Sequence, residues 1–307
     1  MRNAFVKELL ELVKQNDKIV VLSADIGNRM FDRHKEYAPD RFYNCGVAEA
    51  NMISLAAGMA LSGLVPVAYT IAPFITIRCL EQIKIDICYH NVPVVLIGTG
   101  SGLSYAELGP THHSLDDIAL LRCLPNMTVI APGDPVEAAL ALRAAVALEK
   151  PVYIRIGKKG EPAVHQTAPD LVIGKGLVMN QGEDVCLLST GNVLPESMGA
   201  AARLQRAKIS AQVISCHTIK PLDDELLKKI FAKFKYIVTV EEHGLVGGLG
   251  SAVCEWAADN RFQNHTIIRC GSPDRFLHKV GSQEHYRREF GLTAETIENK
   301  IRKELAK

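Results

Sequence analysis

Short apolar runs alternate with helix-like periodicity through the first half of the chain. Five β-branched runs have the length of strands, at residues 19–22, 65–69, 94–97, 128–130 and 152–156. Between them, residues 49–62, 77–89 and 135–148 carry apolar side chains at three- and four-residue spacing, the period of an amphipathic helix. Strands that alternate with helices in this way predict a parallel sheet joined by crossover helices.

The second half repeats the alternation after an interruption. Beyond Gly157 the chain is polar and irregular up to about residue 176, so a linker is predicted at 166–176. Strands are then expected at 185–188, 211–214, 237–240 and 266–268, and helices at 195–206, 223–234 and 251–260. The pattern predicts two successive open-sheet α/β domains, 1–165 and 177–307. Such sheets bind ligands at the carboxyl ends of their strands.

Composition and charge narrow the function classes. A chain of 307 residues that is 48% hydrophobic is long enough for two globular domains. The 35 basic and 34 acidic residues leave a formal net charge of +1, which argues against an extended nucleic-acid or anionic-membrane surface. No apolar run has the ~20 residues of a membrane span, and the N-terminal segment MRNAFVKE becomes charged too soon for a signal peptide. A cytoplasmic location is expected.

Two acidic residues stand where ligands of such a fold would bind. Glu49 lies at the start of the predicted helix 49–62, and Asp25 follows the strand 19–22. Both have ordinary structural explanations as well. Acidic residues are favoured in the first turn of a helix, where N–H groups lack partners, and an Asp after a strand often caps a turn. The neighbouring residues decide between these interpretations.

The segment around Glu49 resembles the transketolase and deoxyxylulose-phosphate synthase families, whose pyrimidine-binding domain carries Gly-x-x-Glu, here Gly46-Val-Ala-Glu49. The similarity continues in order through further segments: residues 69–78 (YTIAPFITIR), 81–84 (EQIK), 109–113 (GPTHH), 121–126 (LRCLPN) and 131–132 (AP). Residues 240–250 (VEEHGLVGGLG) resemble the C-terminal domain of the same families. The resemblance therefore spans nearly the whole chain, as a pyrimidine-binding domain followed by a transketolase C-terminal domain.

The resemblance implies thiamine diphosphate as cofactor and a role for four residues beside it. Glu49 would engage N1′ of the aminopyrimidine, so that the cofactor's own imino nitrogen can deprotonate its thiazolium ring. Phe74 would pack against the pyrimidine, and Arg78 and Asp25 would lie near the cofactor. Taken alone, Phe74 also fits a core aromatic at a helix start, and Arg78 is equally typical of a solvated helix face.

Two further residues would contact substrate by the same resemblance. His112, in the family's Gly-Pro-Thr-His motif, would face the sugar and assist proton transfer, although an isolated loop histidine is usually solvated. Lys158 would hold a substrate phosphate, or be a simple linker charge. The role of His113 is left open. Leu108 stands where transketolases commonly carry Asp, and an apolar side chain cannot accept a substrate hydroxyl, so the natural sugars are expected to differ from ordinary pentose phosphates.

The diphosphate-binding signature of full-length relatives, Gly-Asp-Gly followed by Asn, is absent from this sequence. The resemblance therefore implies a separate N-terminal subunit that supplies the Mg²⁺ ligands, and a symmetric heterotetramer whose active site forms between unlike subunits. Self-association of this chain is expected as well. No His, Cys or Asp cluster has the spacing of a metal site on this chain alone.

The expected function is that of the C-terminal subunit of a transketolase, which transfers a two-carbon ketol unit from a ketose phosphate to an aldose phosphate. One alternative is the beta subunit of a 2-oxoacid dehydrogenase's decarboxylating component, which the Gly-Pro-Thr-His motif disfavours. Another is a catalytically silent paralogue that only binds a partner, which the presence of both Glu49 and His112 disfavours. A nicotinamide dehydrogenase would need its glycines after the first strand, and the glycines at 244–250 do not match that placement.

Overall fold

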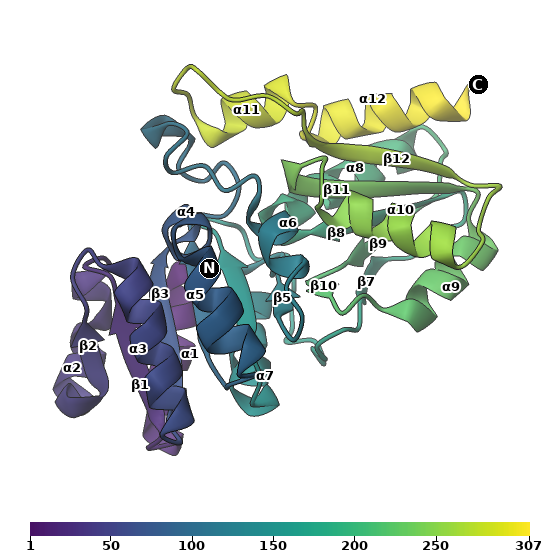
Figure 1. The fold of residues 1–307 in the computed structure, drawn as a ribbon. Coiled ribbons are helices and arrows are strands. Elements are labelled where there is room, and N and C mark those ends of the chain that lie inside the picture. The colour runs from purple at the N-terminus through teal and green to yellow at the C-terminus, as the bar shows by residue number, and fades with distance from the viewer.

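The computed structural model describes the backbone of residues 1–307 and every side chain except that of Asn28. It contains two open sheets, each covered by helices (Figure 1). The prediction of two successive α/β domains is confirmed. The segment 157–176, between the sheets along the chain, forms neither helix nor strand, and the predicted linker lies inside it. No helix among the described residues is long and apolar enough to cross a membrane.

The first sheet has seven strands, and its central strands are parallel and fully buried. Their spatial order is β10 (Thr218–Lys220), β5 (Thr128–Ile130), β6 (Val152–Ile156), β4 (Val95–Thr99), β3 (Val65–Ile71), β1 (Ile19–Ser23) and β2 (Phe42–Asn44). Burial on both faces explains why these strands are continuous apolar runs in the sequence.

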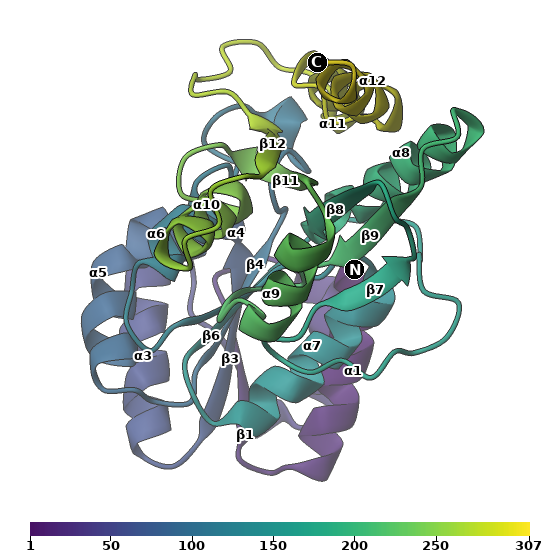
Figure 2. The same ribbon diagram turned by 90° about the vertical axis from the view of Figure 1, so that its right-hand side faces the viewer.

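Helices cover both faces of this sheet, as Figure 2 shows. On one face α1 (Arg2–Gln15) and α7 (Pro135–Leu148) pack against the strands. On the other lies α3 (Glu49–Leu61), beside a broken helical segment. That segment was predicted as one helix over 77–89, but it divides into the 3₁₀ turn η3 (Ile77–Cys79), the single turn α5 (Leu80–Gln82) and the π-helix η4 (Ile83–Tyr89). The apolar spacing was correct, because Ile83 and Ile87 are buried, but hydrophobic spacing does not distinguish these helix types.

The second sheet has five strands, with an antiparallel strand at one edge. Their order is β12 (Thr266–Ser272), β11 (Tyr236–Gly244), β8 (Val185–Thr190), β9 (Ala211–Ser215) and β7 (Leu177–Asn180). One face packs against α8 (Leu194–Arg206) and α12 (Ala294–Leu305), and the other against α9 (Asp224–Lys233) and α10 (Leu249–Asp259). The remaining helices are short: α2 (Asp32–Tyr37), α4 (Ala72–Ile75), α6 (Asp117–Arg122) and α11 (Gln283–Glu289).

One strand joins the two halves of the molecule. Strand β10 lies in the second half of the chain but pairs antiparallel with β5 at the edge of the first sheet. The Ala131 N–H also donates to the His217 carbonyl just before β10. The sequence did not predict β10, because three residues are too few to show a period. The first sheet is therefore completed by the second half of the chain.

Candidate active site

Glu49 is delivered to the carboxyl end of the first sheet by a tight turn after β2. The Asn44 side-chain oxygen accepts the Gly46 N–H at 3.0 Å, and Gly46 has φ +71°, a conformation that favours glycine. Helix α3 then begins at Glu49. The Glu49 side chain is only 4% exposed. A carboxylate is thus held at a helix start, at the end of the sheet where α/β folds bind ligands.

Arg78 and Phe74 surround this carboxylate. Both follow β3, Phe74 in α4 and Arg78 in η3. Arg78 Nη1 donates to Glu49 Oε2 at 2.9 Å, and the guanidinium carbon lies 4.1 Å from the centroid of the Phe74 ring. The Arg78 side chain is 45% exposed, so this ion pair lies at the surface on one side. The structure thus brings Glu49, Phe74 and Arg78 together. We call these three residues, with the side chains that contact them, the contact set.

His112 joins the same set from the loop that follows β4. Its ring lies edge-on to Phe74, with centroids 5.1 Å apart, and 6.2 Å from the ring of Tyr105. The Thr111 hydroxyl lies 2.9 Å from His112 Nδ1. Burial lowers the pKa of His112, and the charges of His113 and Arg78 act in the same direction. His112 is therefore disposed to stay neutral at pH 7.

Lys158 follows β6 and reaches the far side of that loop. It forms an ion pair with Glu107 and lies 4.7 Å from the centroid of the Tyr105 ring. Leu108, next to Glu107, is exposed at the same loop. Contacts thus run without interruption from Glu49 to Lys158. Tyr105 and Glu107 were not predicted from the sequence, although their place in the loop before the Gly-Pro-Thr-His motif was a usable signal.

Asp25 and His113 have local partners. Asn44 Nδ2 donates to Asp25 Oδ1 at 2.9 Å, and the Asp25 N–H donates to Asn44 Oδ1 at 3.1 Å. Asp25 thereby supports the turn that leads to Glu49, and the structure pairs it with Asn44 rather than with Glu49. His113 is buried, and its Nε2 lies 3.3 Å from the Ala106 carbonyl. That contact assigns His113 to the packing of the loop.

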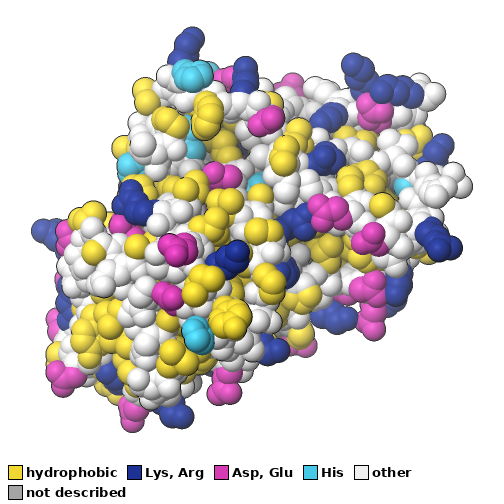
Figure 3. Space-filling view, in the orientation of Figure 1, with side chains coloured by type: hydrophobic (Ala, Val, Ile, Leu, Met, Phe, Trp, Pro, Cys, Tyr) yellow, Lys and Arg dark blue, Asp and Glu magenta, His cyan; other side chains and the backbone are white. Residues whose placement is uncertain are grey.

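The contact set lies on an open face. Val47 is 77% exposed and Ile77 is 51% exposed, and each lies within two residues of Glu49 or Arg78 in the chain. Figure 3 shows hydrophobic side chains gathered over this side of the first domain, where α3 and α5 face the viewer. Apolar patches of this kind on a folded chain typically mark an interface.

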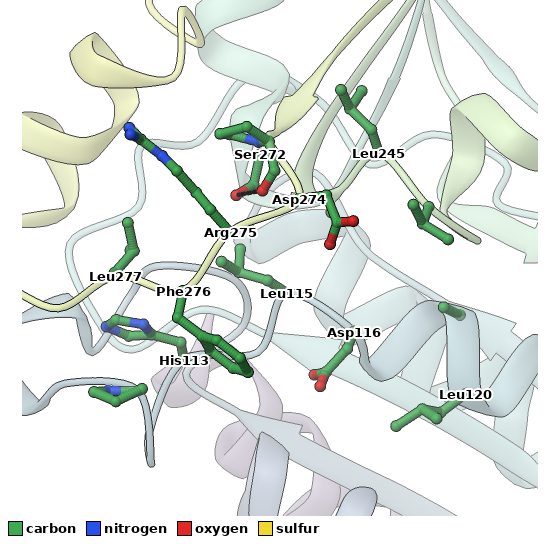
Figure 4. Close-up of a pocket in the computed structure, with 15 residues that line it drawn as sticks. His113, Leu115, Asp116, Leu120, Leu245, Ser272, Asp274, Arg275, Phe276 and Leu277 are labelled. Carbon is green, nitrogen blue, oxygen red and sulfur yellow. Dashed lines mark hydrogen bonds between the residues drawn. The ribbon is translucent and has the colours of Figure 1, made fainter.

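A cavity of about 440 Å³ lies elsewhere, between the two domains (Figure 4). Residues of the 110–120 segment form one wall, and residues 244–246 and 272–277 form the other. His113, Leu115 and Phe276 line it, whereas Glu49, Phe74, Arg78 and His112 do not. We place the candidate site on the open face, because the predicted site residues Glu49, Phe74, Arg78 and His112 contact one another there.

The residues on this face fit a flat, nitrogen-rich ring. Only Oε2 of Glu49 has a hydrogen-bond partner among the described side chains, so Oε1 remains for a ligand. The Arg78 guanidinium, itself planar and rich in N–H groups, already bonds this carboxylate and stacks on the Phe74 ring. An aminopyrimidine presents a similar shape and similar donors. Within the described part of the chain, no three His, Cys, Asp or Glu side chains lie close enough to hold a metal ion.

Comparison with known proteins identifies the class. The transketolase pyrimidine-binding domain matches residues 1–161, and the transketolase C-terminal domain matches residues 174–297. The chain belongs to the transketolase family, as the sequence resemblance indicated. Proteins of this family use thiamine diphosphate.

Individual relatives have about the same length as this chain. A putative transketolase C-terminal section of Methanocaldococcus jannaschii is 35% identical over 310 residues, covering 100% of this chain and 96% of the relative. One subunit of the apulose-4-phosphate transketolase of Actinobacillus succinogenes is 35% identical over 299 residues, covering 97% and 96%. A solved split-gene transketolase, described as an inactive beta4 tetramer, is 34% identical with a TM-score of 0.88, covering 98% and 96%.

Proposed function

We propose that this chain is the C-terminal subunit of a thiamine-diphosphate-dependent transketolase, which transfers a two-carbon ketol unit from a ketose phosphate to an aldose phosphate. The observation that carries the proposal is the position of Glu49. Its carboxylate is nearly buried at a helix start, keeps one oxygen unpaired among the described side chains, and belongs to one contact set with Phe74 and His112.

Thiamine diphosphate, when bound, supplies the nucleophilic carbon that carries the ketol unit. Glu49 would hold a proton at N1′ of the aminopyrimidine, because its unpaired Oε1 can accept or share that proton. Phe74 would bound one face of the ring. Arg78 lies against both Glu49 and Phe74. As the pyrimidine ring enters, Arg78 would either move aside or keep its bond to the Glu49 carboxylate while the ring bonds the other oxygen. The half-exposed position of Arg78 leaves it room for that movement.

His112 and Lys158 would act on the sugar. The Thr111 hydroxyl occupies Nδ1 of His112, so Nε2 is the nitrogen available to a substrate hydroxyl or carbonyl. A lowered pKa keeps His112 able to accept a proton at neutral pH. Lys158, at the outer end of the contact set, would bind the substrate phosphate. Leu108 offers no hydrogen-bond acceptor, so the preferred sugars would lack a hydroxyl that needs one at this point.

We also propose that the active site is completed by a separate subunit. The open face around Glu49, with exposed Val47 and Ile77, suits contact with a second chain that carries the diphosphate and Mg²⁺ site. The names of relatives support this, since one is a single subunit of a transketolase and another is a split-gene transketolase whose beta4 tetramer is inactive. The expected assembly is a heterotetramer built on self-association of this chain.

The test is reconstitution. The purified chain and the N-terminal transketolase subunit from the same organism are assayed separately and together, with thiamine diphosphate and Mg²⁺, for two-carbon ketol transfer. Activity in the mixture alone supports the proposal. Association that depends on the cofactor but yields no ketol transfer with any sugar phosphate would instead indicate a silent paralogue, and activity of this chain alone would refute the shared site.

A further inference from the structure

The loop that carries His112 is anchored at its base. The Ser114 N–H donates to the Gly102 carbonyl at 2.9 Å and closes residues 102–114 into a loop above β4. At the start of this loop the Leu103 N–H donates to Glu242 Oε1 at 2.7 Å. Glu242 belongs to β11 of the second domain. A loop that presents a candidate catalytic residue is therefore bonded to the other domain.

Glu242 is itself held firmly by helix α11. It is buried, its carboxylate accepts two contacts from Gln283 Nε2 at 2.8 and 3.1 Å, and it forms an ion pair with Arg287. A buried carboxylate with several partners keeps a fixed position. Figure 1 shows the loop between β4 and α6 rising from the first domain to lie beside α11.

Further hydrogen bonds reinforce the same junction. Arg287 Nη2 donates to the Asn192 carbonyl at 3.1 Å, and Asn192 Nδ2 donates to the Ser104 hydroxyl at 3.2 Å. At the end of the loop, Arg155 Nη2 donates to the Ser114 carbonyl at 3.0 Å and lies 3.3 Å from the Glu242 carbonyl. Both ends of the loop are thus fixed to Glu242 or its neighbours.

The fit between loop and carboxylate is close. A Cβ added to Gly102 would lie 2.6 Å from both the main-chain oxygen and Oε1 of Glu242. Gly102 also has φ +59°, which disfavours other residues. The loop backbone approaches Glu242 as nearly as a glycine allows, so a shift of the carboxylate would be transmitted directly to the loop.

We propose that Glu242 is a positioning residue, which sets the place of His112 by holding the base of the loop 102–114. Its carboxylate contacts the loop backbone, Gln283 and Arg287, and acts on the site only through that backbone. This inference rests on the proposed function, which makes His112 a substrate-contacting residue. The effect of Glu242 on the loop can nevertheless be measured without turnover. Through Glu242, the second domain would hold the loop of the first domain that carries His112.

The first measurement is hydrogen exchange in Glu242→Ala, with Glu298→Ala as the matched control. Glu298 is also a buried glutamate of the second domain paired with an arginine, Arg203, at 2.6 Å. Glu242→Ala removes the hydrogen bond to the Leu103 N–H together with the Gln283 and Arg287 contacts, so exchange of the 103–114 amides should speed up by at least about tenfold. The control should leave these amides unchanged. Equal exchange in wild type and Glu242→Ala, or equal acceleration in both variants, would overturn the proposal.

The second measurement is the titration of His112 by NMR. The partial burial that lowers its pKa depends on the loop position, so a loosened loop should raise the pKa of His112 toward 6.5 in Glu242→Ala. Glu242→Gln keeps a carbonyl oxygen for the Leu103 N–H and should restore the wild-type value, at least in part. Gly102→Ala, which disturbs the same contact from the loop side, should behave like Glu242→Ala. An unchanged pKa of His112 in both damaging variants would contradict a positioning role.

Turnover separates this inference from the proposed function. In the reconstituted complex, Glu242→Ala should lower kcat by about tenfold or more, since a catalytic side chain is misplaced, and should leave thiamine diphosphate affinity within about twofold, because Glu49 and Phe74 lie outside the loop. A wild-type complex without ketol transfer would refute the proposed function, while the exchange and titration results would still decide whether Glu242 positions the loop.

Discussion

Replacement of Glu49 by Gln separates a catalytic carboxylate from a structural one. The chain offers a matched control in Glu298. The two side chains are 4% and 8% exposed, and each meets a half-exposed arginine, Arg78 at 2.9 Å and Arg203 at 2.6 Å. Glu298 also lies 3.5 Å from Arg302, but Arg302 is 55% exposed, so this second contact adds little to the stability of the pair.

The expected loss of stability is similar for both variants. Gln preserves shape and one acceptor oxygen, and the remaining arginine can turn to water because its side chain is nearly half exposed. The loss should therefore be that of one charge-assisted hydrogen bond, about 1–2 kcal/mol in the free energy of unfolding, rather than the ~3–5 kcal/mol of a fully buried broken pair. Urea unfolding followed by circular dichroism measures this difference.

The expected loss of activity differs between them. Glu49→Gln cannot share a proton with the cofactor, and removal of proton-transfer assistance should lower kcat by about 10²- to 10⁴-fold. That range corresponds to about 3–5 kcal/mol in the activation barrier. Glu298→Gln should keep kcat within about twofold. Retention of more than a tenth of the activity in Glu49→Gln, or an equal loss in Glu298→Gln, would refute the assignment of Glu49.

Three other substitutions test the substrate contacts and the core. Leu108→Asp restores a hydroxyl acceptor and should raise kcat/KM for pentose phosphates by about tenfold, and an unchanged ratio between sugars would exclude Leu108 from specificity. Lys158→Met should raise KM about tenfold for a phosphorylated aldose and spare its unphosphorylated analogue, with Lys159→Met as control; an equal effect on both sugars would argue against a phosphate contact. His34 is buried with no hydrogen-bond partner among the described residues, and burial lowers its pKa to about 4. Between pH 6.5 and 4 the unfolded chain therefore binds a proton at His34 that the folded chain does not. The free energy of unfolding should decrease as the pH is lowered through that window. His34→Phe should be more stabilising at about pH 5 than at about pH 7 in urea unfolding, and equal effects at both values would refute this.

Much of the fold followed from local chemistry. Helix α7 has the predicted bounds, Pro135–Leu148, because Asp134 accepts the Glu137 N–H at 2.8 Å and Pro135 occupies the first turn. The central strands are buried on both faces, so their continuous apolar runs could be recognised as strands in the sequence. Helix α1 was not predicted, and β2 and β10 have only three residues each, too few for a period to appear.

The candidate site was also predicted only in part. The motifs pointed to Glu49, Phe74, Arg78 and His112, and the fold places these four side chains in one contact set. Their role as a cofactor site stays a prediction. The motifs did not reveal that Arg78 would lie between Glu49 and Phe74. That arrangement depends on the end of α4, after which η3 packs against α3 and Arg78 reaches Glu49 at the start of that helix.

By itself the sequence determined the alternation of strands and helices, the place of Glu49 at a helix start, and the family, because each depends on residues close together in the chain. The tertiary structure alone decided which distant segments meet. Strand β10 completes the first sheet from the second half of the chain, and Glu242 bonds the Leu103 N–H, 139 residues away. Contacts of this kind depend on the packing of the whole domain pair, and local periodicity carries no information about them.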